Sequence, residues 1–232
     1  MTYEELKKII ESKSYEGYLN HFAQDGRVNS YLSKNPIKYM LQDMFPENFI
    51  TASTRSWYDI GLYFGSKFFP INIKITNGDK TDNVGSKKGM FYCMTGINLD
   101  EQGDRKKLIR YKSFPEFNIN LVANYNPNTD ADYYYLVLFK DTRRIVFTSM
   151  KHLRIVEPNG HNLPFQCRWN ENTTDSHRCY NTQCQYLMDT YLESFQQRAK
   201  GLIDLYRWNQ LLSINSAVKM EMAPIADAKT ST

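Results

Sequence analysis

The stretch WYDIGLYFGSKFFPINIKIT, residues 57–76, decides the fold that we expect for this chain. Both of its halves are rich in β-branched and aromatic residues, and Gly65-Ser66 between them is typical of a turn. We therefore predict a β-hairpin with strands over residues 57–64 and 68–76. Because side chains alternate between the two faces of a strand, Asn72 and Lys74 should share one face while the isoleucines beside them enter the core.

Asp59 lies on the first predicted strand, and the hairpin can bring it to the same edge as Asn72 and Lys74. This combination suits hydrolysis of a phosphodiester. Oxygen ligands hold Mg²⁺ against the phosphate, and an ammonium orients or deprotonates the attacking water and stabilises the developing charge. The Asn72 amide can coordinate a cation, but it contributes no charge. Taken singly, a strand-end carboxylate and an exposed strand lysine are common, so only the combination favours a catalytic site.

The pattern of Asp59, twelve intervening residues and Asn72-x-Lys74 resembles the motif of the PD-(D/E)XK nucleases, with the second carboxylate replaced by an amide. Within this superfamily the chain is similar to type II restriction endonucleases of the HincII-like and SwaI-like branch, over about residues 50–212. The resemblance implies that Asp59, Asn72 and Lys74 are catalytic. It also implies a metal site at Asp59, Asn72 and Ile73, which would take Mg²⁺, or Mn²⁺ as a substitute.

Asn72 has three explanations. It is a natural substitution with another carboxylate supplying the charge, an aspartate changed to asparagine so that uncut DNA is trapped, or a sign that the protein binds DNA without cutting it. The persistence of Asp59 and Lys74 at the spacing of the motif favours the first two explanations. A second departure is that no counterpart of the glutamate on the family's early helix is found in residues 30–43.

Two polar loops are candidates for DNA contact, one directly after the predicted catalytic strand and one with the sequence EPNGHNLP at residues 157–164. Lysines suit phosphates, and asparagine can pair with adenine. Each loop is equally compatible with an ordinary turn. A basic cluster at residues 105–110 is either a solvated helix face or a phosphate contact. The candidate DNA-binding residues are Asn77, Lys80, Asn83, Ser86, Lys87, Lys88, Asn159, His161, Asn162, Arg168 and Arg178.

The remaining pattern predicts helices and strands around the hairpin. Helices are expected over residues 3–12 behind an N-cap at Thr2, from about Pro36 to residue 45, around residues 90–94, and over residues 183–212. Further strands are expected at residues 117–125, 133–139, 144–148 and 165–169. The fold class is therefore α/β, with a mixed sheet of five or six strands flanked by helices.

Composition supports one domain. A chain of 232 residues with 41% hydrophobic and 14% aromatic residues can form one sizeable core. We expect a nuclease domain over residues 1–212, with a helical part at about residues 1–48 and a flexible tail at residues 213–232. The net charge of +4 is too small to identify a nucleic-acid binder. The four cysteines form no CxxC pair, so we expect free thiols and neither a zinc site nor disulfides. No membrane or signal segment is evident, so we expect a cytoplasmic protein.

The resemblance thus implies an endonuclease that cuts double-stranded DNA at a short palindromic site, working as a homodimer because a palindrome presents two equivalent strands. A restriction enzyme also implies a cognate DNA methyltransferase in the same host. One alternative is a resolvase or repair endonuclease that recognises DNA shape. The other is a non-catalytic DNA-binding or structural protein in which the motif is incidental.

Overall fold

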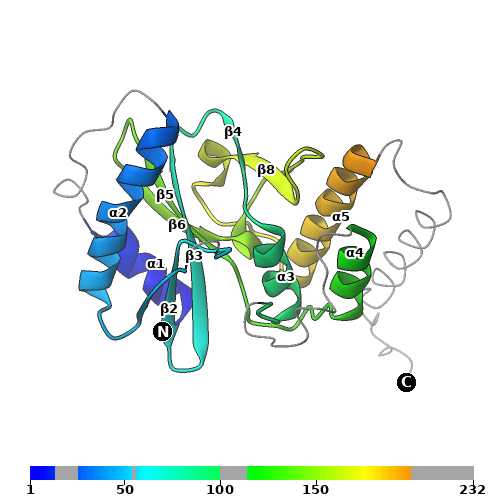
Figure 1. The fold of residues 1–232 in the computed structure, drawn as a ribbon, viewed down its shortest axis with the longest axis horizontal. Helices are drawn as coiled ribbons and strands as arrows, with labels where there is room; N and C mark the ends of the chain where they lie inside the picture. Colours follow the sequence, from blue (N-terminus) through cyan, green and yellow to red (C-terminus); the bar gives the residue numbers. More distant parts are fainter. Residues whose placement is uncertain (14–25, 54–55, 100–113, 200–232) are drawn as a thin grey trace, which may run out of the picture.

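The chain folds in three layers, with a mixed sheet between two groups of helices (Figure 1). The computed structural model describes residues 1–13, 26–53, 56–99 and 114–199. Helices α1 and α2 cover one face of the sheet, and α3, α4 and α5 lie on the other side together with a second, smaller sheet. The predicted α/β class with a five-stranded mixed sheet is confirmed.

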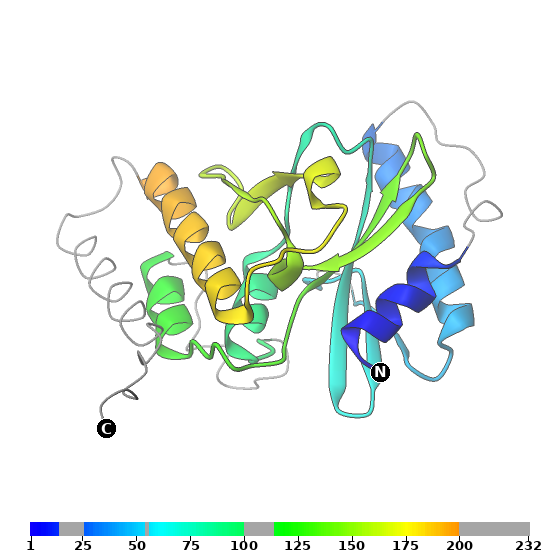
Figure 2. The same cartoon turned by 180° about the vertical axis from the view of Figure 1, so that it is seen from behind.

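Helix α1, Tyr3–Glu11, begins as predicted at a capping box in which the Thr2 side chain accepts from Glu5 N–H and the Glu5 carboxylate accepts from Thr2 N–H. It packs beside β6, Ile145–Ser149, at the edge of the sheet (Figure 2). Glu11 Oε1 accepts from the backbone N–H of Phe147 at 2.7 Å, and Lys7 Nζ donates to the carbonyl of the same residue. Two side chains of α1 therefore satisfy the backbone groups of Phe147 on the side of β6 where no other strand of the described residues pairs with it.

Helix α2, Gly26–Met44, is longer than the sequence predicts. The prediction started it near Pro36, because proline favours the first turn of a helix, but Pro36 lies inside the helix. The end before Pro46 is as expected. The chain then enters β1, Phe49–Thr51, which pairs antiparallel with β2, Ile60–Phe64.

The predicted hairpin is present as β2 and β3, Lys67–Thr76, and its turn uses Gly65 at a φ of 62°. Ile60 lies opposite Ile71 in the antiparallel register. On its other side β3 runs parallel to β5, Tyr134–Phe139, with Asn72 beside Tyr135. Strand β6 then pairs antiparallel with β5, which gives the order β1-β2-β3-β5-β6.

A parallel pair needs a long crossover, and the segment between β3 and β5 contains β4, Thr81–Asn83, α3, Lys87–Thr95, and α4, Phe114–Ala123. The prediction of a strand at residues 117–125 is wrong, because this segment forms α4. Its apolar residues alternate with asparagines, which imitates a strand. In the helix Phe117, Asn118 and Leu121 are buried instead, and Ile119 is half exposed. Tyr191 donates to Asn118, so the polar residue is used inside.

A second sheet has the order β4-β8-β7, with β7 at Glu157–Pro158 and β8 at Phe165–Arg168. Strand β4 lies within the segment predicted as a loop. Two short 3-10 helices, η3 at Met150–His152 and η4 at Trp169–Asn172, precede α5, Tyr180–Ala199. The predicted continuation of this helix to residue 212, the tail and the basic cluster at residues 105–110 lie outside the described residues.

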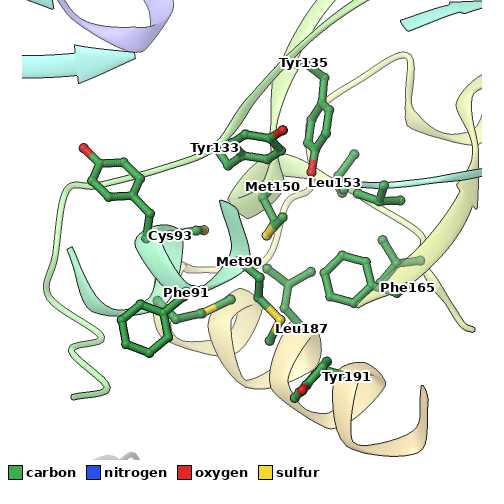
Figure 3. Close-up of a cluster of buried hydrophobic side chains, with 14 of the residues drawn as sticks. Met90, Phe91, Cys93, Tyr133, Tyr135, Met150, Leu153, Phe165, Leu187 and Tyr191 are labelled. Carbon is green, nitrogen blue, oxygen red and sulfur yellow. The ribbon is translucent and has the colours of Figure 1, made fainter. Parts of the chain in front are cut away.

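The two faces of the main sheet bury two separate cores. The first lies under α1 and α2 and takes the isoleucines of β3. The second joins β5 to α3, α5 and the smaller sheet, and Figure 3 shows Tyr133 and Tyr135 above Met90 and Leu187. Among the helices that the structure describes, none has the length and apolar character that a membrane span requires.

Candidate functional site

Asp59 lies one residue before β2, so the first strand of the hairpin begins at Ile60 and not at residue 57 as predicted. The backbone N–H of Asp59 donates to the carbonyl of Ile71, the residue that lies opposite Ile60, at 2.9 Å. Its carboxylate Oδ2 accepts from the backbone N–H of Ile73 at 2.8 Å. The pairing of β2 with β3 ends at Ile71, so the Asp59 carboxylate takes the hydrogen bond of the next outward-facing N–H of β3. Asp59 thus lies at the open edge of β3.

The same edge presents the carbonyl of Ile73. In an extended strand the N–H and C=O of one residue point to the same neighbour. Since the Ile73 N–H meets Asp59, its carbonyl oxygen also points to the side of Asp59 and away from β5. The Thr76 carbonyl, three residues on, points the other way and accepts from Lys140 N–H at 2.9 Å, as this alternation requires.

Helix α2 contributes a lysine to this edge. Lys34 Nζ lies 2.8 Å from Asp59 Oδ2 and 3.1 Å from Oδ1, and about a fifth of each side chain is exposed (23% and 20%). Asp59 therefore accepts from an ammonium with both oxygens and from a backbone amide with one. The pair joins α2 to the beginning of β2.

Asn72 and Lys74 point to the same face, as predicted, while Ile71 and Ile73 enter the core under α1 and α2. Asn72 is half-buried and hydrogen-bonds the Tyr133 hydroxyl. Tyr133 donates its own proton to the Trp57 carbonyl at 2.7 Å, so its oxygen can accept from the amide of Asn72. Burial, followed by the nearby negative charge of Asp59, raises the pKa of Tyr133 well above its ordinary value.

Lys74 is held by β4, which returns over the face of β3 on the way to α3 (Figure 1). Its Nζ donates to the Asn83 carbonyl and lies 3.2 Å from Asp82 Oδ2. The Trp169 indole N–H donates to the same Asp82 oxygen at 2.9 Å. Lys74 is 16% exposed and Asp82 is 36% exposed, so this ion pair borders on solvent.

Two ion pairs therefore lie beside β3. Lys34 pairs with Asp59 at the open edge of the strand, and Asp82 pairs with Lys74 over its face. We call Lys34, Asp59, Asn72, Lys74 and Asp82 the β3 charge array. Oxygens of Asp59, Asn72 and the Ile73 carbonyl are the donors that Mg²⁺ prefers, so the chemistry of this set fits a hard cation. Only one of the three is charged, and that one is shared with Lys34. The array can hold a cation or a phosphate beside an ammonium.

The polar loop after β3 divides into exposed and structural residues. Asn77 and Lys80 are exposed. Ser86 is the N-cap of α3 and accepts from Gly89 N–H at 3.0 Å, so its hydroxyl is engaged in the fold. Lys87 and Lys88 occupy the first turn of α3 and are half-buried. Burial, with Arg198 nearby, lowers the pKa of Lys87.

Asn159 is not available to read a base in this structure. It is 8% exposed. Its Oδ1 accepts from the backbone N–H groups of His161 and Asn162, both at 3.0 Å. Its Nδ2 donates to Asn83 Oδ1 at 2.9 Å and to Gln166 Oε1 at 3.1 Å. The side chain organises the turn between β7 and β8 and ties it to β4, whereas His161 and Asn162 are exposed.

The two candidate arginines are both engaged within the protein. Arg168 pairs with Glu157 at 3.0 Å and Glu171 at 3.4 Å, and is 43% exposed. Arg178 donates to the Arg154 carbonyl at 2.8 Å and lies 4.0 Å from the centre of the Tyr186 ring. Arg168 is the last residue of β8 in the smaller sheet, whereas Arg178 fastens the segment before α5.

Sequence reasoning missed Lys34 and Asp82. Lys34 lies within the segment where the prediction searched for a glutamate but precedes the predicted helix start near Pro36, so its place on the same helix as the core residue Met40 was not used. Asp82 was treated as part of a loop. A three-residue strand with the pattern exposed, half-buried, exposed is too short to give a periodic signal.

Comparisons with known proteins leave the family open: no protein-family model matches the chain, and no curated protein matches its sequence. Within the described residues, no group of three or more His, Cys, Asp or Glu side chains is arranged to hold a metal ion. The cysteines are free, with Cys179 exposed and the others buried.

Proposed function

We propose that this chain is a Mg²⁺-dependent endonuclease that cuts double-stranded DNA, in the manner of the PD-(D/E)XK type II restriction endonucleases that its motif resembles. One observation carries the proposal. Asp59, which lies thirteen positions before Asn72, reaches the open edge of β3, where its N–H donates to the Ile71 carbonyl and its carboxylate accepts from the Ile73 N–H. Lys74 follows Asn72 by two residues on the same face. A mixed sheet flanked by helices agrees with the fold that the resemblance implies.

The residues would divide the work of phosphodiester hydrolysis. Asp59, the Asn72 amide oxygen and the Ile73 carbonyl would hold the metal, which supplies Lewis-acid polarisation of the phosphate. Lys74 would orient the attacking water and stabilise charge on the phosphate oxygens. The water oxygen forms the new bond to phosphorus, the bond to the 3′ oxygen breaks, and this oxygen takes up a proton. The ends would carry a 5′-phosphate and a 3′-hydroxyl.

DNA would approach the edge of β3 and the smaller sheet beside it. The exposed side chains at Asn77, Lys80, His161 and Asn162 suit contacts to phosphates and base edges. Two copies of the chain would cut the two strands of a palindrome. A methyltransferase of the same specificity would protect the host DNA.

The test is digestion of a mixed-sequence plasmid by the purified chain and by Asn72→Asp, with Mg²⁺ and with EDTA, followed by sequencing of the ends. We expect discrete bands that Mg²⁺ requires, stronger with Asn72→Asp, and none with Asn72→Asp/Lys74→Ala. Nicking only at junctions or distorted sites would favour a structure-specific resolvase or repair enzyme. No cleavage by any variant would reject the nuclease and favour a DNA-binding or structural protein.

A further inference from the structure

We propose that Asp82 supplies the carboxylate that position 72 lacks, so that the metal site of the proposed nuclease is completed from β4. This inference rests on the proposed function. It begins with the charge of the array. Asp59 and Asp82 carry two negative charges, Lys34 and Lys74 carry two positive charges, and Asn72 carries none. Without Asp82 the array would be net positive and would repel a divalent cation.

Asp82 is well placed for this role. Asp82 Oδ2 lies 3.2 Å from Lys74 Nζ, and Lys74 follows Asn72 on the same face of β3. Asp59 contacts β3 at the Ile73 N–H and Asp82 contacts the Lys74 ammonium, so the two carboxylates contact consecutive residues of β3. With 36% of its side chain exposed, Asp82 can be reached by an ion from solvent.

The carboxylate is also held in a fixed place. Asp82 is the middle residue of β4 and pairs with Cys167 of β8, which is fully buried. The indole of Trp169, itself 1% exposed, donates to Oδ2 at 2.9 Å. Trp169 and Lys74 both contact Oδ2, so Oδ1 can turn to an ion while the anchor on Trp169 is kept.

A purely structural role for Asp82 makes a different prediction. Asparagine keeps an oxygen that can accept from Trp169 and Lys74 but removes the charge, so Asp82→Asn should preserve the anchor. Asn72→Asp restores a carboxylate two residues from Lys74 on β3. If Asp82 serves the metal, Asn72→Asp should rescue Asp82→Asn. If Asp82 only fastens β4, a carboxylate at position 72 should rescue nothing.

The experiment measures the dissociation constant of Mn²⁺ by electron paramagnetic resonance, and plasmid cleavage with Mg²⁺, for the full chain and three variants. These are Asp82→Asn, Asn72→Asp/Asp82→Asn, and Asp79→Asn as a control for the same charge change at an exposed position three residues before Asp82. We expect Asp82→Asn to weaken Mn²⁺ binding about tenfold to a hundredfold, by analogy with groups that support a metal site. The double variant should return toward the original affinity, and Asp79→Asn should change it little.

Two results would overturn the role of Asp82 alone: unchanged Mn²⁺ binding in Asp82→Asn, or a double variant as weak as the single one. A large fall in melting temperature in Asp82→Asn that Asn72→Asp does not reverse would likewise assign Asp82 to the fold. If the unaltered chain and Asn72→Asp neither bind Mn²⁺ nor cut DNA, the proposed function itself fails. The two failures are therefore distinct.

Discussion

Asn72 and Asn159 were both assigned to function from the sequence, but the structure uses them in opposite ways. Asn72 is half-buried on β3 beside two ion pairs, and its known partner is one phenol, that of Tyr133. Asn159 is 8% exposed, and its amide makes four hydrogen bonds that shape the turn between β7 and β8. The Asn72 amide lies beside charged side chains, whereas all the hydrogen bonds of the Asn159 amide described above stabilise the turn.

The difference shows which polar residues deserve a functional interpretation. An asparagine in a turn beside Pro and Gly has local backbone groups to satisfy, and its side chain can be used up there. A polar residue within an apolar strand has its own backbone in the sheet, so its side chain is free for another partner. In this chain the amide in the strand, Asn72, is less engaged by the fold than the amide in the turn, Asn159.

The largest expected effect separates the two regions by activity. In the Asn72→Asp background, Asp59→Asn should lower plasmid cleavage by about a thousandfold, because the metal contributes several kcal/mol of charge stabilisation. Asparagine keeps an oxygen for the Ile73 N–H, so the fold should persist. Rates at saturating Mg²⁺ test this, with Asp43→Asn, on the exposed side of α2, as the control. Equal rates for Asp59→Asn and its parent would remove Asp59 from the site.

The second effect separates the regions by stability. Asn159→Ala should lower the free energy of unfolding by about 2–3 kcal/mol, because its partners lose their hydrogen bonds and an unsatisfied buried group costs about 1–3 kcal/mol. Asn162→Ala, in the same turn but exposed, should stay within about 0.5 kcal/mol. Urea denaturation measures both. A normal stability for Asn159→Ala would reopen its assignment to DNA contact.

The third effect concerns the cation on Asp59. Lys34→Gln should tighten Mn²⁺ binding several-fold, since an ion pair about one-fifth exposed contributes on the order of 1 kcal/mol, which the metal must otherwise displace. Lys38→Gln, one turn further along α2, is the matched control. Calorimetric titration in the absence of DNA gives both affinities. Identical shifts in the two variants would indicate general electrostatics and leave Lys34 without a specific role.

The smallest effect tests whether Lys87 is retained for DNA at a cost to the fold. A cation in the first turn opposes the helix dipole, and burial lowers the pKa of Lys87, so Lys87→Gln should raise stability by a few tenths of a kcal/mol at neutral pH. The charged form is the disfavoured one. The advantage of glutamine should therefore shrink as pH rises through the lowered pKa toward the ordinary lysine value of 10.5.

Two measurements decide this last prediction. Melting temperatures from pH 7 to about 10 follow the stability difference, and filter binding at several salt concentrations follows DNA affinity. We expect weaker DNA binding and a shallower salt dependence in Lys87→Gln. A stabilised variant with unaltered DNA binding would make Lys87 a neutral feature of α3.

Local patterns predicted the elements whose residues carry their own signals. Thr2 and Glu5 predict the start of α1, and Gly65-Ser66 predicts the hairpin turn. The alternation of polar and apolar residues around Asn72 predicts which side chains of β3 enter the core. Residues 117–125 failed because their alternation also fits a helix that buries Phe117 and Leu121. Over so few residues, periodicity cannot distinguish a strand from a helix.

For the candidate site, the sequence predicted the residues that come from one hairpin but not the partners that come from other elements. Asp59, Asn72 and Lys74 come from one short segment, and a hairpin brings the two ends of such a segment together. Their proximity can therefore be predicted from their spacing. The partners Lys34 and Asp82 come from α2 and β4, and their contacts depend on how a helix and a short strand dock on β3. No local propensity encodes that docking.

The side chains that α1 lends to β6 have a consequence for handling the protein. An uncovered border of a sheet is a template on which another molecule can add its own strand. Lys7 and Glu11 occupy both backbone groups of Phe147 and so cap the template near its centre. A shortened chain that begins after residue 11 would expose this border and would also lose the buried side chains of Leu6 and Ile10 from the core under α1 and α2, so we expect it to self-associate.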